Sequence, residues 1–182
     1  MNDETPDILT SSSSGQTSPR PDPGGEGVTA KKKRGKAGAK AAAAALEARI
    51  EHKFADPALL ATAFTHVSAL KSGHKRRESY QRLEFLGDHV LGLIVSDMLF
   101  RTFPNANEGE LSKRLADLVR KESCADVATA LGLLDDIKLG AVGAIASARL
   151  RKSVLGDICE AVIGAIFLDG GYAAAAKFVE RN

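Results

Sequence analysis

Residues 80–95, YQRLEFLGDHVLGLIV, constrain the fold of this chain more than any other stretch. Apolar side chains recur through the segment at the spacing of a buried α-helix. Glu84 and Asp88, however, lie four residues apart and therefore on one face of that helix. Two carboxylates on one face repel each other, and their burial is costly unless something compensates their charge. The segment therefore predicts a core helix whose acidic face needs either solvent or a cation.

A second apolar helix, expected over residues 154–169, carries the same kind of feature. Asp157 and Glu160 are three residues apart within VLGDICEAVIGAIFLD. If the two acidic faces meet, four carboxylates converge, and such a cluster stays ionised only beside cations. Carboxylate oxygens suit Mg²⁺ and Mn²⁺, and divalent ions held in this way activate water and stabilise a leaving oxygen in phosphoryl chemistry.

Spacing within each helix does not prove that the faces converge. Two ordinary amphipathic helices with solvated acids are the alternative, and the spacing alone leaves both interpretations open. A di-iron carboxylate bundle is disfavoured, because such bundles use Glu-x-x-His pairs. The residues three positions after Glu84 and Glu160 are Gly87 and Ile163.

The rest of the chain divides into further helices, and no strand-like alternation is present. The predicted fold class is therefore all-α. Residues 133–151 stay undecided between a loop and one short helix. The predicted helices cover residues 37–54, 57–65, 80–103, 108–121, 123–131, 154–169 and 172–181, with N-caps at Asp56, Asn107 and Ser153 and helix ends near Gly132 and Gly170.

Residues 1–40 differ in composition from the remainder, and we predict a disordered tail followed by one folded domain over residues 41–182. The tail is rich in Ser, Pro and Gly and ends in a basic run, KKKRGK, at residues 31–36. That run fits either a solubilising tail or a weak hook for polyanions. The tail holds seven of the 25 basic and five of the 23 acidic residues, so the domain holds eighteen of each. Any basic binding surface must therefore be local.

The chain shows no membrane or export signal. No apolar run reaches the roughly 18 residues that a membrane helix needs, and the N-terminus lacks the order of a signal peptide. Cys124 and Cys159 are far apart in sequence and form no CxxC motif, which favours two reduced, buried thiols. We therefore expect a cytoplasmic protein.

Four blocks of this sequence resemble, in order, those of the ribonuclease III family of double-stranded-RNA endonucleases. The most specific block is RLEFLGDHVLG at residues 82–92. The others are FTHVS at residues 64–68, NEGELSKRLADLV at residues 107–119 and SVLGDICEAVIGAIFLDGGY at residues 153–172. The resemblance covers about residues 45–180 and implies the family's all-helical, homodimeric nuclease domain.

Carried over position by position, the resemblance implies an active site of four acids. Glu84, Asp157 and Glu160 match the family's metal ligands, while Asp88 and Glu160 match the residues usually named catalytic. Glu108 matches an acid near the cleft that supports RNA cleavage. The implied cofactor is Mg²⁺, with Mn²⁺ as a substitute and no small-molecule cofactor.

The implied reaction is hydrolysis of both strands of double-stranded RNA, leaving 5′-phosphate and 3′-hydroxyl ends and a short 3′ overhang. The family's substrates are ribosomal RNA precursors, some messenger RNAs and structured small RNAs. Phe85 and Leu86 would help to form the dimer contact. The basic loop of residues 71–77 offers Lys75, Arg76 and Arg77 as phosphate contacts, and His66 matches a family position that we interpret as structural.

Two departures from the family pattern matter. Gln81 stands where many members have Glu, which removes one anionic group near the acids. The chain ends at Asn182, whereas bacterial members usually continue into a double-stranded-RNA-binding domain, so we expect a fragment or a nuclease domain that binds RNA more weakly. The rival interpretation is an inactive relative that binds duplex RNA. Retention of all four acids speaks against it.

Overall fold

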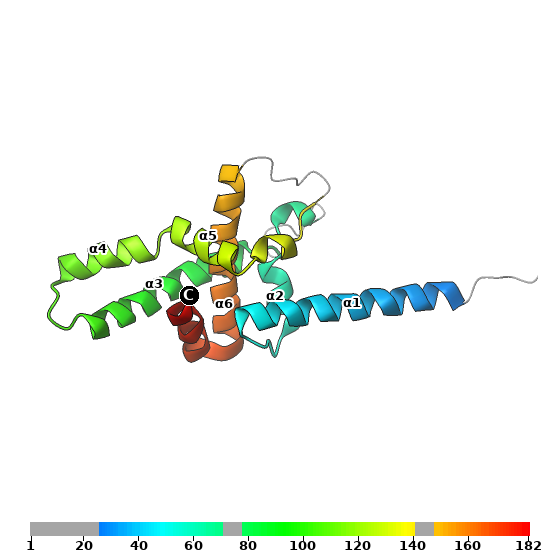
Figure 1. Cartoon of the computed structure of the whole chain (residues 1–182), viewed down its shortest axis with the longest axis horizontal. Coiled ribbons are helices and arrows are strands. Elements are labelled where there is room, and N and C mark those ends of the chain that lie inside the picture. The colour runs from blue at the N-terminus through cyan, green and yellow to red at the C-terminus, as the bar shows by residue number, and fades with distance from the viewer. Residues whose placement is uncertain (1–25, 71–77, 141–147) are drawn as a thin grey trace, which may run out of the picture. The chain divides into compact units, whose positions relative to one another are not determined.

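The structure is a computed structural model that describes residues 26–70, 78–140 and 148–182. The chain divides at Gly38 into two units, and the second, Ala39–Asn182, carries the core and the candidate site described below. The elements, in chain order (Figure 1), are α1 (Glu26–Ile50), α2 (Pro57–Ala63), the 3₁₀ turn η1 (Val67–Ala69), α3 (Gln81–Thr102), α4 (Glu108–Leu118), α5 (Lys121–Ala130), the 3₁₀ turn η2 (Leu133–Asp136) and α6 (Ala148–Arg181).

The prediction of an all-α fold is confirmed over the described ranges. Their one β-type contact is an isolated bridge between Thr65 and Lys138. None of the helices in these ranges combines the length and apolar character required to cross a bilayer.

The core forms around α6, which contacts α2, α3 and α5. Ile158, Val162 and Ile166 of α6 are fully buried, as is Ile94 of α3. Burial on this scale is the main stabilising contribution in a helical domain. The amphipathic α4 has no buried residue and runs back alongside α3 (Figure 1). Helices α3 and α6 thus form the centre of the fold.

Two glycines set the distance between α3 and α6. A Cβ placed on Gly87 would lie 1.7 Å from the carbonyl oxygen of Glu160, and one on Gly164 would lie 2.3 Å from that of Leu83. Side chains at these positions would hold the helices apart, whereas glycine lets the two backbones touch. Since Gly87 lies between Glu84 and Asp88, the close approach occurs at the acidic segment.

Several predicted helix boundaries are confirmed. The Asp56 side chain accepts a hydrogen bond from Ala58 N, with Pro57 at the first helical position. Asn107 and Glu110 form a reciprocal capping box at the start of α4. Gly132 adopts a left-handed conformation, with φ of 63°, after α5. These boundaries follow from local chemistry, which is why sequence alone suffices to predict them.

Other predicted boundaries are wrong. Ser153 caps no helix, because α6 already includes Ala148 and continues to a break at Gly171, whose φ is 74°. The helix expected to run to residue 121 ends at Leu118, and α5 begins at Lys121 rather than at residue 123, since Arg120 is extended. Helix α1 begins at Glu26, in a segment that includes Lys, Arg and Ala, residues of high helix propensity. The division into tail and domain stays a prediction.

Candidate metal centre

Three carboxylates from two helices meet at the contact between α3 and α6. Glu84 comes from α3, and Asp157 and Glu160 come from α6. One oxygen from each lies within 4.8 Å of the others. Glu160 is buried, with 7% of its surface exposed, and the other two are half-buried. The two acidic faces therefore converge, and the alternative of two separate solvated pairs does not hold.

Asp88 lies at the rim of this acidic cluster rather than inside it. Its side chain is 58% exposed and its Oδ2 lies 3.9 Å from Nδ1 of His89. It does not belong to the group of three carboxylates, but its charge contributes to the raised pKa of Glu160. The fourth predicted acid is thus close enough to act on the cluster while remaining open to solvent.

Asp157 has two further partners that the sequence did not reveal. The buried Tyr80, which precedes α3, donates a hydrogen bond from its hydroxyl to Asp157 Oδ2 at 3.1 Å. The Lys121 ammonium, from the first residue of α5, forms an ion pair with Oδ1. That oxygen is buried, and no group in the described part of the chain donates it a hydrogen bond of good geometry. Neither partner lies at helical spacing from Asp157, so no local pattern could have indicated either contact.

Burial and mutual repulsion raise the pKa of two of the acids. For Glu160, burial together with the charge of Asp88 raises the pKa to about 7. For Glu84, burial and the charge of Asp157 raise the pKa to about 6. In both cases the positive charge of Lys121 lowers the pKa, but not by enough to cancel the rise. One lysine therefore leaves the cluster with excess negative charge, which a divalent cation would neutralise.

The residues present fit a hard divalent cation. The three convergent groups are all carboxylates, the donor type that Mg²⁺ and Mn²⁺ favour. One of their oxygens, Asp157 Oδ1, is buried, and the cation that contacts it among the described residues is the Lys121 ammonium. Glu84, Asp157 and Glu160 are thus the candidate ligand set.

The raised pKa values predict how the stability of the metal-free protein depends on pH. A carboxyl group whose pKa rises on folding binds its proton more tightly in the folded state, so stability falls as pH rises from about 4.5 toward 7. We expect the melting temperature in chelator to be roughly 2–5 °C lower at pH 8 than at pH 5.5. Scanning calorimetry at both pH values measures this difference. The Glu160→Gln variant should show a smaller difference, and an equal or larger one would contradict the assignment.

The other predicted site residues are not members of the group of three convergent carboxylates, or lie outside the described ranges. Glu108 is exposed at the start of α4, where it accepts a hydrogen bond from Ser112 at 3.0 Å. Gln81, the first residue of α3, is exposed. His66 accepts a hydrogen bond from Ser68 N, which agrees with a structural role. The proposed phosphate contacts, Lys75, Arg76 and Arg77, lie outside the described residues.

The fold and the site together define an all-helical domain with an acidic centre suited to a divalent cation. Comparison with known proteins is consistent with this class. A sequence model of the ribonuclease-III-like family matches residues 56–182. Ribonuclease 3 of Bradyrhizobium diazoefficiens is 78% identical over 84% of this chain and 62% of that protein. Ribonuclease 3 of Rhodopseudomonas palustris is 67% identical over 100% of this chain and 67% of that protein.

A solved structure has the same architecture. The nuclease domain of ribonuclease III from Campylobacter jejuni, described for flexibility in a region involved in dimer formation, superposes with a TM-score of 0.68 at 39% identity. The match covers 75% of this chain and 92% of that one. The chain belongs to the ribonuclease III family. It spans 62% and 67% of the length of the two curated relatives.

Proposed function

We propose that this chain is the nuclease part of a Mg²⁺-dependent endoribonuclease that hydrolyses both strands of double-stranded RNA. The observation that carries the proposal is the convergence of Glu84, Asp157 and Glu160 within 4.8 Å at the contact between α3 and α6. The expected products have 5′-phosphate and 3′-hydroxyl ends. On the family resemblance, the expected substrates are ribosomal RNA precursors, some messenger RNAs and structured small RNAs, and the expected location is the cytoplasm.

Each residue at or near the cluster would have its own role in catalysis. Glu84, Asp157 and Glu160 would hold Mg²⁺, which when bound supplies an activated water and stabilises charge on the phosphate and the leaving oxygen. Tyr80 keeps the Asp157 carboxylate oriented through its hydrogen bond. Asp88 is exposed, and its charge acts on Glu160; in the proposed reaction it would accept a hydrogen bond from the attacking water and fix its direction. Gln81 and Glu108 remain candidates for RNA contact or support.

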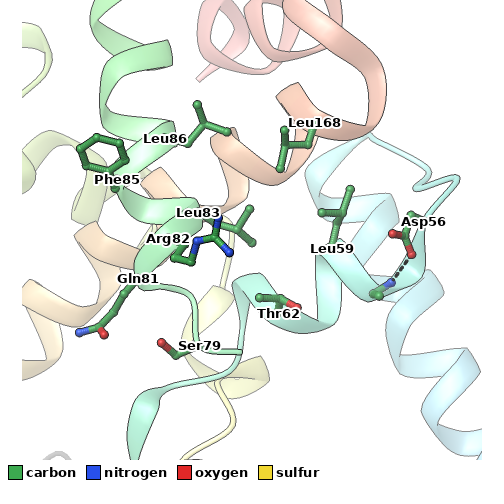
Figure 2. A pocket seen from close by; sticks show the side chains of 11 residues that line it. Asp56, Leu59, Thr62, Ser79, Gln81, Arg82, Leu83, Phe85, Leu86 and Leu168 are labelled. Carbon is green, nitrogen blue, oxygen red and sulfur yellow. Dashed lines mark hydrogen bonds between the residues drawn. The ribbon is translucent and has the colours of Figure 1, made fainter. Parts of the chain in front are cut away.

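The surface next to the site supports a homodimer. Phe85, one residue after Glu84, is 68% exposed, an unusual state for a large aromatic side chain. It stands at the edge of an open hollow of about 780 Å³ whose lining includes Leu59, Leu86 and Leu168 (Figure 2). In a two-fold dimer each Phe85 would enter the partner's hollow, because an isologous interface pairs a patch with its own copy.

Phe85→Asp should therefore convert the dimer to a monomer. An aspartate would lose hydration in a hollow whose lining combines leucines with polar residues, and it would forfeit the contacts of an aromatic anchor, which contribute about 2 kcal/mol or more to an interface. Light scattering after size-exclusion chromatography at micromolar concentration measures the mass. Phe100→Asp, at a side chain that is 72% exposed on the same helix but does not line the hollow, is the matched control. A dimer that survives Phe85→Asp would place the interface elsewhere.

Cleavage of duplex RNA tests the proposed activity. We expect a labelled duplex to be cut in the presence of Mg²⁺ and to remain intact with chelator, while single-stranded RNA and duplex DNA of the same sequence are spared. Sequencing gels with end-specific ligation identify the product ends. Binding of duplex RNA with no Mg²⁺-dependent cleavage at any protein concentration would favour the rival interpretation, an inactive relative.

A further inference from the structure

Lys121 contacts the acidic cluster from a helix that carries none of its acids. It is the first residue of α5, and its ammonium forms an ion pair with the buried Oδ1 of Asp157. The charges of Glu84 and Glu160 also favour the protonated form of this lysine and help to raise its pKa, although burial opposes them. The positive charge of Lys121 therefore acts on all three candidate ligands, although the lysine contacts Asp157 directly.

The backbone of α6 leaves room for the lysine stem. A Cβ on Gly156, the residue before Asp157, would lie 2.6 Å from Lys121 Cγ and 2.9 Å from the Lys121 carbonyl oxygen. Glycine at this position therefore allows the start of α5 to lie directly on α6 and the lysine side chain to pass over it. The approach of Lys121 to Asp157 is thus built into the packing of the two helices and is not a chance surface contact. The lysine side chain is nevertheless 44% exposed and has solvent into which it can move.

We propose that Lys121 is a built-in counter-cation that competes with the divalent metal for Asp157. This inference rests on the proposed metal site. In the metal-free protein the ammonium partly neutralises three crowded carboxylates and so stabilises the fold. A metal ion bound through Asp157 Oδ1 would place a second cation against the first, and the two repel strongly over a few ångströms near a protein surface. Metal binding therefore requires the lysine to leave that oxygen.

The competing explanation assigns Lys121 a purely supportive role. If the lysine only holds Asp157 in a productive orientation, its removal should weaken metal binding, because a ligand would become less ordered. If it competes, its removal should strengthen binding. The two explanations predict opposite signs for one measured quantity, the dissociation constant of the metal.

The test is calorimetric titration of the full chain with Mn²⁺, and with Mg²⁺, together with the melting temperature in chelator. Lys121→Met keeps most of the stem and removes the charge. We expect it to bind Mn²⁺ about fivefold more tightly or better, a size consistent with removing one nearby cation, and to melt at a lower temperature in chelator. Lys121→Arg should have nearly the same affinity for Mn²⁺ and nearly the same melting temperature in chelator as the unaltered protein. Lys152→Met, which breaks the exposed pair of Lys152 with Asp126, is the control and should change neither.

Unchanged or weaker Mn²⁺ binding by Lys121→Met, with the unaltered protein binding normally, overturns the competition and leaves the metal site intact. A metal-free melting temperature that does not fall would overturn the counter-cation role. Absence of binding by the unaltered protein would overturn the metal site and, with it, the competition.

Discussion

Glu160→Gln should reduce duplex-RNA cleavage by about a thousandfold or more, since the loss of an anionic metal ligand removes several kcal/mol of transition-state stabilisation. Glu160 is the most buried of the three convergent acids. Glutamine has the same volume, so the packing of α3 against α6 should survive. Because burial and neighbouring acids raise the pKa of Glu160 to about 7, the neutral amide should also leave the metal-free protein at least as stable at pH 8.

Initial cleavage rates at saturating Mg²⁺, with circular dichroism melts as the measure of folding, test this prediction. Glu180→Gln is the matched control, because it makes the same chemical change at an exposed position of α6, beyond the break at Gly171. Its rate should equal that of the unaltered protein. A Glu160→Gln rate within tenfold of that value would mean that the candidate centre is misplaced.

Gly87→Ala should reduce stability and activity more than any other substitution that adds a single methyl group near the site. The new Cβ would lie 1.7 Å from the carbonyl oxygen of Glu160, which is backbone and cannot rotate away. Helices α3 and α6 must then separate. Overpacking of this kind lowers the free energy of unfolding by as much as about 3 kcal/mol, and occasionally by more. The separation also moves Glu84 away from the two acids of α6, and a shift on the order of 1 Å reduces activity about a hundredfold.

Gly92→Ala provides a sharp control for this prediction. Gly92 lies on the same helix, and nothing lies within 4 Å of a Cβ placed there. Alanine in a helix interior is favoured over glycine by about 0.5–1 kcal/mol, so this variant should melt at the same or a higher temperature. Thermal unfolding of both variants, with cleavage rates, measures the contrast. A Gly87→Ala protein as stable and active as Gly92→Ala would contradict the proposed backbone contact.

The sequence predicts the chemistry of the site better than its geometry. Spacing places each acidic pair on one helix face, and the family resemblance implies a site made of Glu84, Asp88, Asp157 and Glu160. Neither source states the distance between the helices. Gly87 and Gly164 determine that distance, but their effect depends on which faces meet, a tertiary property that no local pattern contains.

The residues that sequence reasoning missed share one feature, which is that they act across helices. Tyr80 and Lys121 reach Asp157 from positions 77 and 36 residues earlier in the chain, so no periodicity connects them with it. The error at Ser153 has a different cause. Serine is a good N-cap, but helix-forming residues before it let α6 extend back at least to Ala148. Local preference is overridden wherever neighbouring residues continue the helix.

Anomalous diffraction from crystals grown with Mn²⁺ tests the central claim most directly, because it locates the ion without assuming an activity. The account predicts a strong anomalous peak among the carboxylate oxygens of Glu84, Asp157 and Glu160, which already lie within 4.8 Å of one another. It also predicts that Lys121 has left Asp157 Oδ1. A map with no peak at these three acids, or with the peak elsewhere in the molecule, would contradict it.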